Sequence, residues 1–347
     1  QGMAFSVMLA SGYLTAAVDA VDIALGELSS CLEVAAVRSQ SLANCFQRVV
    51  RLVDRFAMLT EDVSQDDEYA HWIQMHDRGF VIHLTPVSIA AQFGAHVRES
   101  GQAWIMTSAT LAVNESFDHV IDGLGIEHAA TAHYSSPFDF GNQVKAWLPS
   151  SLPRPGDDEH TRALVAACMP VLKTVAGRTF FLFTSYRALN TAALCLEIAG
   201  VEFLAQGNMS RQVLLERFRS KPRAILLATY SFWEGIDVRG ADLQCLIIDK
   251  LPFASPDDAV ASACARALQA RGGNGFVDYT VPEAAISLRQ GFGRLVREES
   301  DRGLFILGDP RVRTRSYGKL FVRSLPEMVW LEEQREAVSY MKGLAAG

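Results

Sequence analysis

The chain has 347 residues, of which 49% are hydrophobic and 20% charged, and its formal net charge is −7. A chain of this length and composition can bury substantial cores in about two domains, so intrinsic disorder is not the expected state. The sequence contains no run of roughly 18 apolar residues and no signal peptide, so we expect a soluble, cytoplasmic protein with no membrane partner. The opening Gln1-Gly2-Met3 resembles a tag remnant before an initiating methionine, and we expect the natural protein to extend further upstream.

Cysteine spacing and charge distribution give two further expectations, on the state of the thiols and on a basic surface. The six cysteines are scattered, without a CxxC pair or a metal-ligand spacing, and we interpret them as reduced, mostly buried thiols. Residues 1–85 contain five Lys/Arg and eleven Asp/Glu, whereas residues 286–323 contain nine and four. The second segment therefore indicates a local basic surface in a chain that is acidic overall.

The N-terminal part of the chain has helical periodicity. Apolar residues recur every three or four positions over residues 42–59, which predicts an amphipathic helix. A longer helix over residues 13–37 precedes it, and we expect the two to pack as a hairpin. Residues 71–84 then contain two short strand-like runs around Asp77-Arg78-Gly79, which predicts a β-hairpin.

From residue 179 onward, short apolar runs alternate with helical segments, which predicts a parallel α/β sheet with helices on both faces. Proline and glycine in residues 150–158 indicate the linker that enters this domain. Functional residues of such sheets follow the carboxyl ends of the strands. The expected strands cover residues 179–183, 201–204, 224–228, 244–248 and 303–307, and helices are expected over residues 188–199 and 211–219.

The strongest chemical signal is Gln290-Gly291-Phe292-Gly293-Arg294-Leu295-Val296-Arg297, at the end of a predicted helix. Two arginines three positions apart on a helix face the same way. Guanidinium groups stay charged and present forked donors, so such a pair can stabilise the charge that develops on a transferred γ-phosphate. On arginine spacing alone a surface salt-bridge pair is the commoner arrangement, and only the full Gln-x-x-Gly-Arg-x-x-Arg pattern favours catalysis.

This pattern resembles motif VI of superfamily 2 helicases, and earlier segments resemble the DinG/XPD family, in its bacterial DinG/YoaA-like branch, in the same order. The resemblance covers about residues 81–326. The matching segments are Thr107-Ser108-Ala109-Thr110-Leu111 (motif III), Phe183-Thr184-Ser185-Tyr186 (motif IV), Gln206-Gly207, Ser231-Phe232-Trp233-Glu234-Gly235-Ile236-Asp237-Val238-Arg239-Gly240 (motif V) and Ile248-Asp249-Lys250-Leu251-Pro252-Phe253.

The resemblance implies an ATP-dependent DNA helicase that unwinds in the 5′ to 3′ direction. It implies catalytic roles for Arg294, Arg297 and Gln290, and a role for Ser108 and Thr110 in coupling nucleotide state to DNA grip. The implied nucleotide-binding residues are Glu234, Gly235 and Asp237, and the implied DNA-binding residues are Thr184, Ser185, Tyr186, Gln206, Lys250 and Phe253. By themselves most of these residues fit a capped turn or a helix cap, and Phe253 fits a core residue.

The departures from the family pattern concern ATP. No GxxxxGK[ST] occurs, since the one Gly-Lys pair, Gly318-Lys319, is followed by Leu320, and no Asp-Glu-x-His follows an expected strand. ATP and Mg²⁺ are therefore expected in the full-length enzyme, and the chain alone is expected to be inactive as an ATPase. An iron–sulfur cluster stays an open question, because its segment in family order lies upstream of Gln1.

In family order, the chain divides into four parts. Residues 1–85 are expected to form a helical arch-like segment with a short hairpin, and residues 86–150 the last part of the first RecA-like motor domain. Residues 151–325 would be the second RecA-like motor domain, and residues 326–347 a C-terminal helix. The implied partners are single-stranded DNA and, through the C-terminal region, a replication or clamp-loader accessory protein. The alternative is a complete, non-hydrolysing DNA- or protein-binding module on the same fold.

Overall fold

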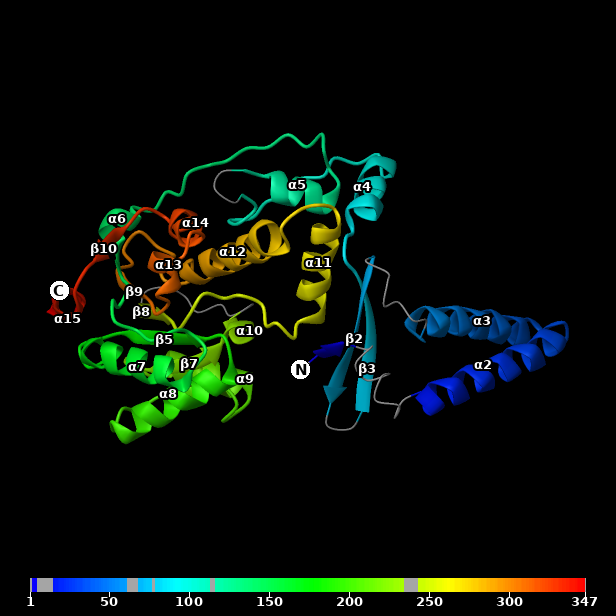
Figure 1. Ribbon diagram of the computed structural model, residues 1–347, viewed down its shortest axis with the longest axis horizontal. Helices are drawn as coiled ribbons and strands as arrows, with labels where there is room; N and C mark the ends of the chain where they lie inside the picture. Colours follow the sequence, from blue (N-terminus) through cyan, green and yellow to red (C-terminus); the bar gives the residue numbers. More distant parts are fainter. Residues whose placement is uncertain are drawn as a thin grey trace. The chain divides into compact units, whose positions relative to one another are not determined.

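The computed structural model shows two compact units in the chain (Figure 1). The first comprises residues 1–102, 123–126 and 254–280, and the second the remaining residues. The structure describes residues 2–4, 15–60, 68–76, 79–112, 116–233 and 243–346.

The first unit contains the helical hairpin that the periodicity of the N-terminal sequence predicted. Helix α2 (Thr15–Ala36) and helix α3 (Gln40–Thr60) lie side by side along their lengths (Figure 1). Val49 is the single buried residue among the described residues of the two helices. The expected mutual burial of two apolar stripes is therefore only partial.

The predicted β-hairpin is confirmed and forms part of an antiparallel sheet of three strands. Its strands are β1 (Gly2–Ala4), β2 (Tyr69–His76) and β3 (Gly79–Pro86), in the order β1-β2-β3. The turn residues Asp77 and Arg78 lie outside the described residues. Helices α4 (Ala90–Glu99) and α11 (Ala259–Ala270) and the π-helical segment η2 (Gly275–Thr280) complete this unit.

The second unit contains a fully parallel sheet of seven described strands, as the alternating apolar runs predicted. The strand order is β10 (Val329–Leu331), β4 (Val144–Trp147), β9 (Gly303–Leu307), β8 (Leu243–Ile248), β5 (Arg178–Phe183), β7 (Ile225–Thr229) and β6 (Leu204–Ala205). Every residue of β5, β7 and β9 is buried, because helices cover both faces.

Two apolar clusters lie on opposite faces of this sheet. Alternate residues of β5 point to different faces, so Phe180 packs in one cluster and Phe181 in the other. The first cluster includes residues of α9 (Arg211–Ser220), α12 (Val281–Phe292) and α14 (Gly318–Ser324). The second includes residues of α7 (Asp158–Leu172), α8 (Tyr186–Ile198) and α15 (Gln334–Ala346).

Several local expectations differ from the structure. The strand β4, expected in the first motor domain, lies in the seven-stranded sheet between β10 and β9. The helix expected from residue 326 begins only at Gln334, because residues 329–331 pair with the free edge of β4 as strand β10. Residues 104–106, which precede the segment that resembles motif III, have no regular secondary structure. The four-part division of the chain stays a prediction.

Two further expectations concern the burial of the cysteine thiols and the length of apolar helices. Cys168 and Cys245 are buried, but Cys31 and Cys45 are exposed, so the expectation of mostly buried thiols is wrong. Burial raises the pKa of the Cys245 thiol to about 12. Among the described residues, no helix is long and apolar enough to cross a membrane.

Candidate functional site

The polar residues of the candidate site follow three adjacent strands of the seven-stranded sheet. Strands β5, β8 and β9 are parallel neighbours, so their carboxyl ends meet at one edge of the sheet. Thr184 follows β5, Asp249 follows β8, and Asp309 follows β9 after one glycine. We call this side of the sheet the carboxyl edge.

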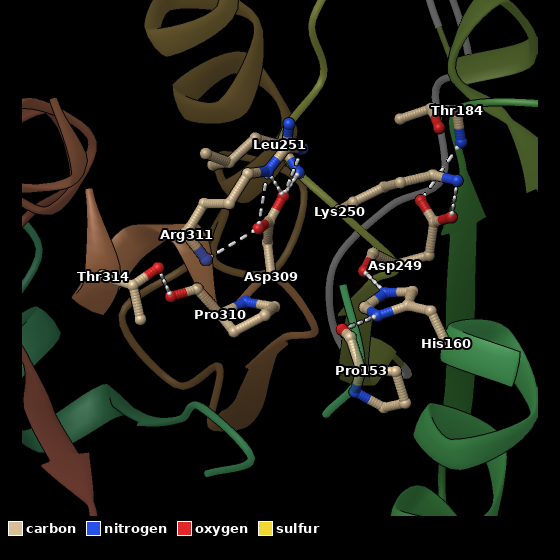
Figure 2. A network of polar contacts seen from close by, with 10 residues as sticks. All are labelled: Pro153, His160, Thr184, Asp249, Lys250, Leu251, Asp309, Pro310, Arg311 and Thr314. Carbon is tan, nitrogen blue, oxygen red and sulfur yellow. Dashed lines mark hydrogen bonds and ion pairs between the residues drawn. The ribbon is translucent and has the colours of Figure 1, made fainter. Parts of the chain in front are cut away.

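The Asp249 carboxylate is the centre of a buried polar network (Figure 2). Its Oδ1 accepts a hydrogen bond from the backbone N–H of Thr184 at 3.1 Å, and its Oδ2 lies 3.4 Å from Nζ of Lys250. Its backbone carbonyl faces Nε2 of buried His160 at 3.1 Å, while Nδ1 of His160 faces the carbonyl of Pro153 at 3.0 Å. Burial raises the pKa of Asp249 to about 7, against the opposing effect of the Lys250 charge.

Two of the residues implied in DNA binding are engaged within the protein. The Lys250 side chain is only 14% exposed, and its ammonium is directed at Asp249. The half-buried Phe253 ring has the Arg311 guanidinium 5.1 Å from its centroid, and it packs edge to face with Tyr317 and Phe321. That Lys250 and Phe253 contact DNA stays a prediction. The ring contacts of Phe253 fit the alternative interpretation, in which it is a packing residue.

Asp309 and Arg311 join the loops that follow β8 and β9. The fully buried Asp309 accepts hydrogen bonds from the backbone N–H of Leu251 at 2.8 Å and from the Arg311 guanidinium at 2.7 and 3.0 Å (Figure 2). Such a charge-assisted, forked pair is geometrically specific. Sequence reasoning missed both residues, although an acidic residue one glycine beyond a buried strand was the signal that would have found Asp309.

The segment that resembles motif IV begins helix α8. Ser185 is the N-cap of this helix, and its hydroxyl accepts a hydrogen bond from the Ala188 N–H at 3.2 Å. Tyr186 is 52% exposed, and its hydroxyl oxygen accepts a hydrogen bond from Nε2 of Gln206 at 2.6 Å. Because Oε1 of Gln206 also accepts from both the N–H and the hydroxyl of Thr229, the glutamine fixes the exposed ring.

The arginine pair lies beyond the helix that was expected to carry it. Helix α12 contains Gln290 and ends at Phe292, so Arg294 and Arg297 lie in the turn that follows. The argument that both face one side of a helix is therefore wrong, and the turn sets their relative placement. Both are partly exposed.

Two buried side chains hold the backbone of this turn. The Asp301 carboxylate accepts hydrogen bonds from the N–H groups of Arg297 at 2.8 Å and Glu298 at 2.9 Å. The Gln143 amide, at the end of α6 (Phe140–Gln143), donates to the carbonyls of Glu298 at 2.9 Å and Glu299 at 3.1 Å. Both side chains act on backbone groups, which explains why spacing patterns did not reveal them.

The segment that resembles motif III contacts helix α12. Nε2 of Gln290 donates to Oγ1 of Thr110 at 3.4 Å, and the Thr110 and Ser108 hydroxyls lie 3.3 Å apart. Arg289, the residue before Gln290, also donates to the carbonyl of Ala112 at 3.4 Å. The same turn of α12 therefore makes two contacts with this segment. The structure thus brings Ser108, Thr110 and Gln290 together. Glu234, Gly235 and Asp237, by contrast, lie outside the described residues.

Comparisons with known proteins show which proteins this chain is similar to. Residues 168–328 match the family described as "Helicase C-terminal domain". The ATP-dependent DNA helicase YoaA of Haemophilus influenzae is 37% identical over 316 residues, which cover 91% of this chain and 49% of that protein. The ATP-dependent helicase DinG of Mycobacterium tuberculosis is 34% identical over 281 residues, covering 80% and 42%. The solved structure named "XPD_Helicase" has a TM-score of 0.58 at 13% identity, covering 86% of this chain and 55% of that one.

The fold of the seven-stranded unit is the RecA-like α/β fold of helicase motor domains. Residues 168–328 match the helicase C-terminal domain, and the chain is similar to the helicases YoaA and DinG over most of its length. It spans about half the length of the curated relatives that it matches.

Proposed function

We propose that the protein containing this chain is an ATP-dependent DNA helicase that unwinds in the 5′ to 3′ direction. In this proposal the seven-stranded unit is its second motor domain. The contact between Gln290 and Thr110 carries the proposal, because it joins the motif VI helix to the segment implied in coupling. A change in the position of α12 would be transmitted directly to Ser108 and Thr110 through these side chains.

Arg294 and Arg297 would act on the transferred γ-phosphate. A guanidinium in a turn that is held by Asp301 and Gln143 is pre-organised, so it loses little conformational freedom when charge develops on the phosphate. ATP and Mg²⁺ would be held mainly by residues outside this chain, since its sequence has no phosphate-binding glycine-rich loop. The residues described here fit the role of completing that site, with Gln290 beside them.

Single-stranded DNA would run along the carboxyl edge. The exposed Tyr186 ring offers a surface for a base to stack on, and Gln206 holds it in place. Thr184 and Ser185 would contact phosphates, Lys250 would hold the Asp249 carboxylate beside them, and Phe253 would support the loop after β8. Contacts of this kind bind a strand without reading its sequence.

Substitution of Arg297 in the full-length protein tests the enzymatic part of this proposal. Arginine residues that act on the γ-phosphate contribute about 10³ to 10⁵ in rate, so Arg297→Ala should abolish most ATP turnover while leaving ATP binding largely intact. The matched control is Arg335→Ala, an exposed arginine on α15. Turnover of Arg297→Ala within a few-fold of the wild type would overturn the assignment, and a full-length protein without any turnover would favour the non-hydrolysing module.

A replication or clamp-loader accessory protein would bind through the C-terminal region. Truncation after Leu325 is not a clean test, because it removes strand β10 and the buried Ala337 and Met341. Charge reversal at the exposed Arg335 and Lys342 keeps the fold and changes only the surface of α15. Loss of a pull-down partner from this variant would support the contact, and unchanged capture would remove it.

A further inference from the structure

A basic surface lies on the two short helices that follow β9. Residues 310–324 contain five Lys/Arg and no Asp/Glu, in a chain whose net charge is −7. Arg311 is paired with Asp309, and the other four side chains are exposed. These four residues, which we call the basic corner, are Arg313 on α13 (Arg311–Thr314), Arg315, and Lys319 and Arg323 on α14.

In the part of the chain that the structure describes, no acidic side chain neutralises the charges of the basic corner. Within that part, the ion pairs of the protein involve other cations, and no carboxylate pairs with any of the four. Lys319 and Arg323 are one helical turn apart and therefore share a face of α14. A concentration of unpaired positive charge costs stability through self-repulsion, which a polyanionic ligand would relieve.

The basic corner is held rigidly. The Arg315 N–H donates to the carbonyl of Arg311 at 2.9 Å, and the Gly318 N–H donates to the carbonyl of Arg315 at 3.0 Å. At Gly318 the two helices approach so closely that an added Cβ would lie 2.6 Å from the carbonyl carbon of Val312. The corner is therefore a pre-formed surface and not a loose loop.

The basic corner begins at the carboxyl edge, beside the loop that follows β8. The N–H of Leu251 donates to Asp309 at 2.8 Å (Figure 2). Arg311 lies over Phe253, so the two loops are joined directly. Lys250 in that loop is mostly buried against Asp249. The exposed positive charge at this end of the edge therefore comes from the corner and not from Lys250.

We propose that the basic corner binds the phosphate backbone of nucleic acid and prolongs the strand path beyond β8, an inference that rests on the proposed function. Four exposed cations on rigid backbone suit evenly spaced phosphates and carry no means of reading bases. Continuity with the exposed Tyr186 along one sheet edge favours nucleic acid over an acidic protein. The corner adds affinity and salt dependence, without sequence preference.

The test measures binding of a labelled 20-nucleotide single strand to the chain by fluorescence anisotropy over a range of salt concentrations. The variant replaces all four corner residues by glutamine (Arg313→Gln, Arg315→Gln, Lys319→Gln, Arg323→Gln). Each phosphate contact of a single strand contributes about 0.7 to the salt slope, so the slope should fall by up to roughly 3. At low salt the Kd should rise about tenfold or more.

The matched control removes the same charge elsewhere, by Lys173→Gln, Arg217→Gln, Arg335→Gln and Lys342→Gln, at four exposed positions outside the basic corner. Thermal unfolding of both variants checks that each is folded. A corner variant that binds like this control overturns the inference. So does poly-glutamate binding as tightly as the oligonucleotide, because the surface would then be a site for acidic protein.

A third variant, Tyr186→Ala, separates the corner from the strand path at α8. If Tyr186→Ala weakens binding and the corner variant matches the control, the inference fails and the proposed function stands. If only the corner variant weakens binding, the inference holds and the path at α8 is wrong. A wild-type chain that binds no single strand even at low salt overturns both.

Discussion

Asp249 is a buried acidic residue whose ionisation the fold changes strongly. Its pKa is raised by burial from 3.8 to about 7, so the folded state holds a proton that the unfolded state has released. The free energy of unfolding should therefore fall as pH rises from about 4 to about 7, by at most roughly 4 kcal/mol. Urea unfolding across this pH range, compared between wild type and Asp249→Asn, measures the effect.

The asparagine variant keeps an acceptor for the Thr184 N–H but does not titrate, so it is the matched reference. Its stability relative to the wild type should rise over the same pH window and level off above pH 7. A difference between the two proteins that does not change with pH would show that Asp249 is ionised throughout, with Lys250 fully compensating its burial.

Asp301 is expected to control the turn of the arginine pair through the backbone. Asp301→Ala leaves the N–H groups of Arg297 and Glu298 without their acceptor, and an unsatisfied buried donor costs about 1–3 kcal/mol. In the full-length protein we expect a lower kcat for ATP with little change in KM, because the arginine acts on transition-state charge. Asp301→Asn keeps an acceptor oxygen and should recover part of the turnover; equal loss in both variants would point to a general folding defect.

At the scale of elements, the close approach of α13 and α14 depends on Gly318. A Cβ at this position would overlap the carbonyl group of Val312, so Gly318→Ala should destabilise the protein by about 1–3 kcal/mol. Gly343 on α15 is the control, because a Cβ there meets nothing within 4 Å. Gly343→Ala should stabilise the protein by up to about 1 kcal/mol through helix propensity. Differential scanning calorimetry that ranks the two variants the other way would contradict this account.

At the scale of the whole molecule, we expect this chain to fold yet to hydrolyse no ATP, even with Mg²⁺ and single-stranded DNA. Phosphoryl transfer needs a phosphate cradle, a lysine on the phosphates and a positioned metal, and the sequence contains no such motif. An ATPase assay of the purified chain, with Arg297→Ala as the contamination control, measures this. Turnover that depends on Arg297 would reveal a phosphate site within these residues.

Much of the architecture follows from local sequence. Strands such as β5 and β9 contain short apolar runs of a length that fits buried strands, and α3 has clear helical periodicity, so each element is recognisable by itself. Strand β10 was missed because three residues do not show a period, and the free edge of β4 decides their conformation. Strand β6 begins later than predicted for a similar reason, since two residues pair with β7.

The sequence by itself determined the fold class, the order of the motifs and the absence of a phosphate-binding loop, because these depend on residue type and spacing along the chain. The tertiary structure alone decided which side chains are exposed to a ligand and which are paired within the protein. It directed Lys250 at Asp249, placed Arg294 and Arg297 beyond the end of α12, and left the four residues of the basic corner exposed. Burial and partner choice depend on residues far apart in the sequence, such as Gln143 and Glu298, and spacing along the chain does not encode them.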